Sequence, residues 1–590
     1  MVPTAPMMRD PMLVKTVQAA PPTVFRMMLA WEAMDGCIAD LLSRLRPFLR
    51  GVRLPSMKRR IGRMAFWGVS SVLVTTAAQA ADIHVDARNA GKENGSLAGP
   101  YRTLGAAVKA AGAGDHIKVA AGSYAENLHL KKGLTIEGGF VGATAEVYAA
   151  GSPGDFSKSD PSKLESEVRG NADAPVVFAD GTIETTLDGL VLKGGKSGVE
   201  SAAYPEDKAR LIVRRSRIEG NGNPSVVGGG IRAKSELLVE DSVVRGNLGD
   251  RGSGIASGPA RAIILRTVIE GNTSHGDHGG GLYAAGPVEV MGCLVRDNTV
   301  GKTAGYGWGG GLMFFNEGTK ATVADTEVSG NFSPTKGSGV FVDDGAEATL
   351  RNVIIVSNRC SKEGGALYVD GATEQKGSKA WLVNVTIAEH DCGDTGYGNA
   401  VVMERASTLD VVSSIFWNNG PRDTSVQPGN TLTVRYSNAK DKLPGTGNLS
   451  TDPLFASPQD GDYRLRNKAG RWDPARKACV KDDVTSPCVD TGDPAGAHDR
   501  EPQPNGGRVD MGAYGNSPLA GCAPEQTLTA AAPGSNAPSL GPSRSGAARG
   551  RCGCEAPGSA GGHLGWLLGG ALLSWAALRR RRKDAGLDGT

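Results

Sequence analysis

An asparagine recurs through the middle of this chain at intervals of 25 to 33 residues. The intervals are 26, 25, 26, 33, 27, 32 and 29 residues, and a histidine stands at one of the positions. A period of this size is typical of a solenoid, in which each repeat is one coil stacked on the next. The series of anchors is Asn221, Asn247, Asn272, Asn298, Asn331, Asn358, His390 and Asn419.

Two rows of apolar residues keep a constant distance from the anchors. The row three positions before them is Ile218, Val244, Ile269, Val295, Val328, Ile355, Ile387 and Phe416. The row eight positions before them is Val213, Val239, Ile264, Val290, Val323, Leu350, Leu382 and Val411. β-Branched residues dominate both rows, as they do in strands. After most anchors a glycine-rich turn leads into another short apolar segment, and no segment is long enough for a crossover helix.

The pattern predicts an all-β fold, a right-handed parallel β-helix with coils ~4.8 Å apart. The apolar rows would fill the interior, and the asparagines would form a ladder of side-chain amides between coils. Charges near the anchors alternate in sign between coils, as at Arg245 and Glu270, and should form solvated ion pairs. A leucine-rich repeat is the rival fold, but it needs leucines at fixed positions that this period lacks.

Composition limits the partners of the chain. Its 65 basic and 62 acidic residues leave a formal net charge of +3, so we predict no nucleic-acid partner. Its 84 glycines lack a G-X-Y period, which excludes collagen and indicates many tight turns.

The repeat resembles that of polymorphic outer-membrane proteins, whose motifs are F-x-x-N and G-G-A-[ILV]. Residues 416–419 and 364–367 match these motifs most fully. Residues 95–140 and 448–515 resemble the two ends of pectate-lyase-like β-helix proteins. The resemblance implies an N-terminal cap with the first coils over 81–184, repeats over 185–420 and a C-terminal cap region over 421–520. The segments that carry it are Pro100–Leu104, Ala113–Ile117, Gly122–Glu126, Asp452–Phe455, Ser486–Asp490 and Met511–Gly515.

Residues 57–80 have the pattern of a signal peptide. A basic start is followed by an apolar stretch and by the small residues Ala78-Gln79-Ala80. We predict cleavage between Ala80 and Ala81 and translation from Met57, which makes residues 1–56 an extension of doubtful translation. A buried amphipathic helix is the alternative.

Residues 551–590 form a candidate sorting tail, preceded by a flexible linker over 521–550 that is rich in Ala, Pro, Ser and Gly. The apolar run at about 561–578 predicts a single transmembrane helix, followed by cytoplasmic arginines. With Cys552 and Cys554, this order resembles the myxobacterial C-terminal sorting signal. The resemblance implies a sorting protease, lipidation of one of the two cysteines and anchoring at the outer-membrane surface. A plain single-span anchor is the alternative.

Cysteine spacing predicts crosslinks suited to an exported protein. Cys360 and Cys392 each lie two residues after an anchor on successive coils, which favours a disulfide over two free thiols. Cys479 could pair with Cys488, and Cys522 is an equal rival for that bond. Cys293 is expected to be buried and inert.

Two groups of polar residues are candidates for chemistry. His275, Asp277 and His278 precede a glycine triplet and could bind a metal or act as acid and base. Asp343 and Asp344 could bind Ca²⁺ or protonate a glycosidic oxygen. An ordinary polar turn is the alternative reading of each.

Aromatic residues concentrate in and beside the longest spacer, at Tyr306, Trp308, Phe314 and Phe315. They could stack on sugars or pack within the coil. We assign no metal site and predict no cofactor, with Ca²⁺ as the one ion considered.

Two functions remain open for the chain. The first is a non-enzymatic surface protein that adheres to, or binds, an extracellular polysaccharide or another cell-surface ligand. The alternative is a polysaccharide lyase or glycoside hydrolase, which predicts that His275, Asp277 and an acidic neighbour line one groove along a sheet face.

Overall fold

The structure is a computed structural model that describes residues 80–180, 184–202, 210–301, 305–362, 364–392, 399–503 and 505–522. The predicted signal segment before Ala80 and the tail with Cys552 and Cys554 lie outside these residues. Among the residues described, no helix is long and apolar enough to cross a membrane.

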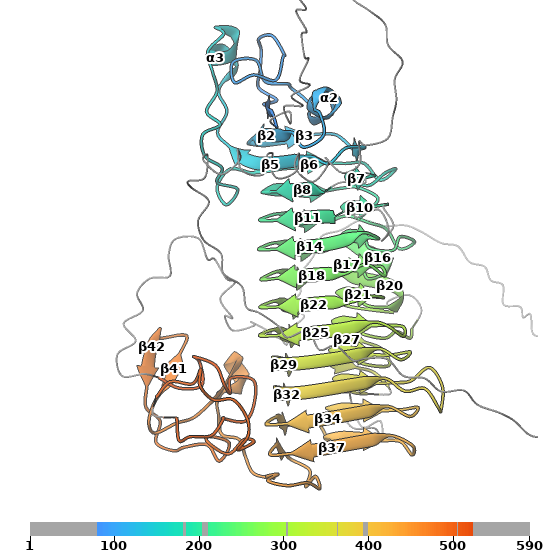
Figure 1. Cartoon of the computed structure of the whole chain (residues 1–590), viewed down its shortest axis with the longest axis vertical. Helices are drawn as coiled ribbons and strands as arrows, with labels where there is room; N and C mark the ends of the chain where they lie inside the picture. The colour runs from blue at the N-terminus through green and yellow to red at the C-terminus, as the bar shows by residue number, and fades with distance from the viewer. Residues whose placement is uncertain are drawn as a thin grey trace, which may run out of the picture. The chain divides into compact units, whose positions relative to one another are not determined.

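Stacked coils build two large sheets, which confirms the parallel β-helix (Figure 1). A typical coil adds two short strands, or one long one, to a 23-stranded first sheet and one strand to an 11-stranded second sheet. Successive coils pair in parallel, as in Val213 with Val239 and Val239 with Ile264. The identical register places like residues above like.

The first sheet is built from two sets of strands. The leading strands are β1 (Asp82–Val85), β2 (His116–Ala120), β5 (Thr135–Phe140), β8 (Thr185–Asp188), β11 (Arg210–Arg214), β14 (Glu236–Glu240), β18 (Ala262–Leu265), β22 (Val288–Met291), β25 (Lys320–Ala324), β34 (Thr408–Val412) and β37 (Thr431–Arg435). The following strands are β3 (Gly122–Tyr124), β6 (Ser166–Arg169), β9 (Leu190–Lys193), β12 (Arg217–Glu219), β15 (Val243–Arg245), β19 (Val268–Glu270), β23 (Leu294–Arg296), β26 (Glu327–Ser329), β35 (Ile415–Trp417) and β38 (Asn438–Ala439). Two long strands, β29 (Glu347–Val356) and β32 (Lys379–Ala388), serve both sets.

The second sheet takes one strand of three residues from each coil. Its strands are β4 (Leu128–Leu130), β7 (Val177–Ala179), β10 (Val199–Ser201), β13 (Ile231–Ala233), β17 (Ile255–Ser257), β21 (Leu282–Ala284), β24 (Leu312–Phe314), β28 (Val340–Val342), β31 (Leu367–Val369), β33 (Val401–Met403) and β36 (Thr424–Val426). Two small sheets, β16 (Leu248–Arg251) with β20 (Thr273–His278) and β27 (Phe332–Ser333) with β30 (Arg359–Cys360), lie between the anchors and the glycine turns.

Both predicted apolar rows fill the interior, with side chains at most 1% exposed. Each such side chain contributes about 1.5–3 kcal/mol by burial. The predicted ion pairs also form, with 2.7 Å between Arg245 and Glu219 and 2.7 Å between Arg296 and Glu270.

The anchors form the predicted ladder. The main-chain N–H and the side-chain amide of Asn247 both donate to Oδ1 of Asn272, each at 3.0 Å. Asn272 in turn donates from Nδ2 to the carbonyl of Val244 at 3.0 Å and to Oδ1 of Asn298 at 2.9 Å. These asparagines are fully buried, so water cannot bond to their polar groups. The hydrogen bonds between coils satisfy these groups instead.

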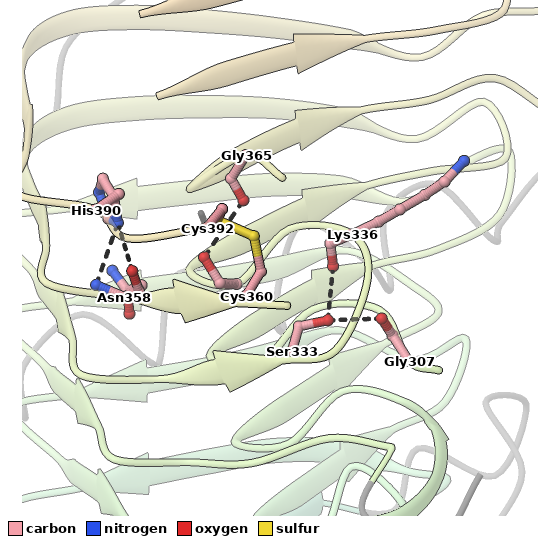
Figure 2. The surroundings of a disulfide bond; sticks show 9 residues. Gly307, Ser333, Lys336, Asn358, Cys360, Gly365, His390 and Cys392 are labelled. Atoms are coloured by element: carbon pink, nitrogen blue, oxygen red, sulfur yellow. Dashed lines mark hydrogen bonds between the residues drawn. A yellow bond between two sulfur atoms is a disulfide. The ribbon is translucent and has the colours of Figure 1, made fainter. Parts of the chain in front are cut away.

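At His390 an imidazole ring takes the place of the asparagine amide in the ladder, beside a disulfide (Figure 2). Nδ1 of His390 accepts the main-chain N–H of Asn358 at 3.1 Å, and Nε2 lies 2.9 Å from the carbonyl of Ile355. This arrangement requires the proton on Nε2 and a neutral ring. Burial lowers the pKa of His390 to about 4. The predicted disulfide between Cys360 and Cys392 joins the same two coils, with Cα atoms 4.4 Å apart.

The pairing of Cys479 with Cys488 is wrong, because Cys479 bonds to Cys522. Cys479 lies on the hairpin of β41 (Arg471–Asp473) and β42 (Ala478–Val480), while Cys488 is buried with Ile415, Leu465 and Met511. Cys293 is buried as predicted, and burial raises its pKa to about 12.

The two ends of the stack are closed differently. At the N-terminal end, α2 (Leu104–Ala110) buries Leu104 and Ala107 in the core. At the other end, residues 443–449 bond to the last coil, with Leu443 packed on the core. Residues 452–522, expected to belong to the cap, instead pack on the outer side of the first sheet, where Tyr463 and Ala513 form one apolar cluster with Ile354, Val356 and Ala388. Their other elements are β39 (Phe455–Ser457), η3 (Pro458–Asp460) and β40 (Asp462–Leu465), and a short helix, α3 (Ala145–Ala149), precedes the repeats.

Candidate functional site

The outer face of the second sheet presents a different residue type from one coil to the next. The first and third residues of most of its strands point into the core, so the middle residue points outward. In register along the stack, the outward residues are Glu200, Arg232, Ala256, Tyr283, Met313, Phe341, Tyr368 and Val402. We call this row the outer column.

A second row runs beside the outer column, just before the glycine turns. It consists of Val227, Arg251, His278, Trp308, Lys336 and Gly364, paired from coil to coil. Its side chains help to cover the outer column, where Met313 and Tyr368 are fully buried although they face away from the core.

His278 lies at the centre of an aromatic cluster. Its ring makes edge contacts with Trp308, Phe315 and Tyr283, with centroids 5.0, 5.4 and 5.9 Å apart. Its Nδ1 bonds to the carboxylate of Asp277. Burial lowers the pKa of His278 despite this carboxylate, so the ring is neutral at pH 7. The pair can therefore hold a ligand hydroxyl or exchange a proton.

A charged group continues the face over the following coils. Lys336 Nζ lies 3.1 Å from Asp370 and 2.7 Å from Glu404, and Arg405 lies 2.6 Å from Asp370. Burial, together with the charge of Asp370, raises the pKa of the neighbouring Asp343 to about 7. Asp343 is thus a carboxyl group that can donate or accept a proton near neutral pH.

A hollow of about 300 Å³ opens at the other end of the aromatic cluster. Ala256 and Gly258 line it where the neighbouring coils carry larger side chains, and Tyr283 lines it as well. Arg232 and Lys234 also border the hollow, and Arg232 is bonded to Glu200 at 2.9 Å. The lining is almost entirely apolar.

A groove of about 580 Å³ lies elsewhere, on the outer side of the first sheet. Its floor is a row of glycines, among them Gly220 and Gly246, and its walls include the ion-paired Glu219, Arg245 and Glu270. These charges already have partners on adjacent coils, which leaves them less available to a ligand.

The structure brings most of the predicted site residues to one face. Asp277, His278, Trp308 and Phe315 are in contact, and the exposed Tyr306 lies 6.0 Å from Trp308.

The other predicted site residues differ in where the structure places them. Burial raises the pKa of Tyr283, and the nearby charge of Asp344 is a smaller contribution in the same direction. His275 is half-buried on β20. Phe314 is an incorrect surface candidate: it is the third residue of β24, so it points into the core and is fully buried. Asp343 and Asp344 do not belong to any group of three possible metal ligands among the described residues, so nothing here supports Ca²⁺ at this turn.

Several residues of the face were missed from sequence, namely Tyr283, Arg251, Lys336, Asp370 and Arg405. A signal for Tyr283 exists, because it stands between Leu282 and Ala284 directly after a glycine triplet. Alignment on the glycine turns, rather than on the anchors, would have identified the whole outer column.

Comparisons with known proteins add little to this geometry. A family described as "Disaggregatase related" matches residues 429–492, which cover the last coil and the segment after it. Among solved structures, the crystal structure of pectate lyase Pel9A matches over 74% of this chain and 96% of that chain, with 13% identity and a TM-score of 0.36. No curated protein sequence matches this chain.

Proposed function

We propose that this protein binds an extracellular polysaccharide on the outer face of the second sheet, as a non-enzymatic adhesion or matrix-binding protein. The observation that carries the proposal is the hollow beside Tyr283. A sugar ring has an apolar face and a rim of hydroxyl groups. The apolar lining next to Tyr283 suits the apolar face of the sugar ring. Arg232 and Lys234, at the border of the hollow, would donate hydrogen bonds to the hydroxyl groups.

Repetition along the stack also supports this function. Tyr283 has the hollow on one side and the His278 cluster on the other, so sugars of one chain could occupy neighbouring coils. Coils ~4.8 Å apart are close to the length of one sugar unit, which suits an extended chain along the stack.

We propose further that the protein is exported and held at the cell surface through its C-terminal tail, after processing by a sorting protease. Two disulfides within the described residues support an oxidising compartment. Cell fractionation with and without the last forty residues tests the anchoring, because loss of the tail should release the protein.

A glycan array with neutral and acidic polysaccharides tests the binding function. Tyr283→Ala should weaken binding about tenfold, since an aromatic contact contributes about 1.5 kcal/mol. Thr322→Ala is the matched control, because Thr322 is exposed on β25 in the first sheet. Equal binding by both variants would contradict the proposed face.

A polysaccharide lyase or hydrolase is the second candidate, favoured by the pKa of Asp343 near 7 beside Asp370, Lys336 and Arg405. Assays for reducing sugars and for unsaturated products separate the two functions. Cleavage that falls about 10²–10⁴-fold in Asp343→Asn would establish an enzyme with this acid or base. Binding without cleavage supports the first function.

A further inference from the structure

The hollow beside Tyr283 is a notch whose floor is one coil wide. In register along the second sheet, the coil before the notch carries Arg232 and the coil after it carries Tyr283, whereas the coil between them presents only Ala256. The next position along the chain repeats this pattern, because Lys234 and Gly258 come directly after the paired strands β13 and β17. Long side chains on the two outer coils therefore border a floor of two small residues.

The backbone does not require the small residues of this floor. A Cβ atom at Gly258 would lie 3.4 Å from the carbonyl oxygen of Ala233 and 3.6 Å from Cα of Lys234, which are ordinary van der Waals distances. Gly258 is also outside the left-handed conformation that favours glycine. At the register of Ala256, the outer column carries the large side chains of Tyr283 and Met313 on the next two coils. The fold thus leaves open a space that larger side chains could fill.

Two hydrogen-bond donors at the border of the hollow have no partner among the described residues. Lys234 is half-buried, yet its Nζ makes neither an ion pair nor a hydrogen bond with that part of the chain. The hydroxyl group of Tyr283 is unpaired in the same sense. Arg232, by contrast, is bonded to Glu200 at 2.9 Å. The hollow therefore combines an apolar floor with two donors that are available to a ligand.

We propose that the polysaccharide bound at this face is acetylated and that the methyl group of an acetyl substituent fills the hollow. The inference rests on the proposed polysaccharide binding. Coils ~4.8 Å apart give the floor a width near the ~4 Å contact diameter of a methyl group, which is narrower than a sugar ring. The acetyl carbonyl oxygen is one bond from the methyl carbon, so it accepts a hydrogen bond from Lys234 or Tyr283 at the border.

The acetyl group also accounts for how a sugar unit lies on the face. With the methyl group between Arg232 and Tyr283, the sugar ring packs against Tyr283, which contacts the ring of Phe315 on the next coil. Lys234 serves the acetyl carbonyl, which leaves Arg232 for the hydroxyl groups of the sugar. A sugar without an acetyl group would leave the floor to water, which an apolar lining cannot hold by hydrogen bonds.

Pairs of glycans that differ only in the acetyl group test the inference. Xylan, glucomannan and alginate are compared in their O-acetylated form and after removal of the acetyl groups with alkali. A chitin oligosaccharide is compared with its N-formyl analogue, which keeps the carbonyl group and lacks only the methyl group. Titration calorimetry on the full chain should show about tenfold weaker binding or more after deacetylation, and about fourfold weaker binding of the N-formyl analogue. The two kinds of pair distinguish an ester-linked from an amide-linked acetyl group.

Ala256→Leu tests the place of the acetyl group. Leucine fills the floor, and the variant should fold, because the outer column already carries Met313 and Val402. The preference for the acetylated glycan should disappear in Ala256→Leu. It should remain in Ala324→Leu, the same change on the outer side of β25 in the first sheet. Lys234→Gln should weaken binding of the acetylated form about tenfold and change that of the deacetylated form little.

The outcomes separate this inference from the function on which it rests. Equal binding of acetylated and deacetylated forms, at a site that Tyr283→Ala still weakens, would overturn the inference and leave the proposed function standing. A preference that persists in Ala256→Leu would overturn the assignment to the hollow. Binding only of deoxy sugars that lack acetyl groups would overturn the choice of substituent. Binding of no glycan in any form would overturn both the function and the inference.

Discussion

The asparagine ladder and the outer column run along the same stack, yet they use repetition in opposite ways. The ladder keeps one residue type through six coils, and each asparagine is buried between the coils before and after it. The outer column changes from a cation at Arg232 to a small residue at Ala256 and an aromatic ring at Tyr283 within three coils.

The difference shows where the stack tolerates variation. A ladder residue must donate to one coil and accept from another, so a change of residue leaves buried groups unpaired on two sides. An outward residue is not required to bond to both neighbouring coils, although Arg232 does pair with Glu200, so its identity is open to selection for a ligand.

Asn272→Ala should have the largest effect on stability. It removes the partners of the Asn247 N–H, the Asn247 amide and the Val244 carbonyl, and should lower the free energy of unfolding by about 4 kcal/mol. Chemical denaturation monitored by circular dichroism measures the change. If Asn272→Ala lowered the free energy of unfolding no more than Thr322→Ala does, the ladder would not be a major source of stability.

The double variant Cys360→Ser/Cys392→Ser, which lacks the disulfide, should show the second largest loss of stability. The bond closes a loop with a sequence separation of 32 residues, and its removal should cost about 3–4 kcal/mol through the entropy of the unfolded chain. Denaturation under the same conditions provides the value. A much smaller loss would mean that stacking alone orders these coils.

His390→Asn should remove a pH dependence from the ladder. The folded-state pKa of His390 is lowered to about 4, from an ordinary value of 6.5, so its contribution is complete above pH 6.5 and is lost as the pH falls toward 4. The stability difference between the wild type and the variant should change by about 3 kcal/mol over this range. Melting temperatures of both proteins from pH 7 to pH 4 would reveal it, and parallel curves would contradict it.

Tyr283→Ala should have the smallest effect on stability, below about 1 kcal/mol, because Tyr283 is half-exposed on the outer face. The same variant should lose polysaccharide binding. A stability loss as large as that of Asn272→Ala would mean that the outer column also holds the coils together.

Much of the fold could be predicted because its determinants recur. The spacing of Ile218, Val244 and Ile269 from their anchors identified the interior, and the shared offset of Cys360 and Cys392 predicted their bond. Features that occur once could not be found this way. Cys479 meets Cys522 because a hairpin and the docking of residues 452–522 bring them together, and no period records that contact.

The candidate site could be predicted from the sequence only in part, for the same reason. His278 and Trp308 stand out as unusual residues beside glycine turns, but their contact depends on the parallel pairing of their coils.

Sequence alone determined which residues face the interior, because burial on every coil imposes the same chemistry at the same interval. Only the tertiary structure decided which outward residues are neighbours. Stacking places residues about thirty positions apart within one coil spacing, so Tyr283 and Phe315 become adjacent through pairing between coils rather than through any local pattern.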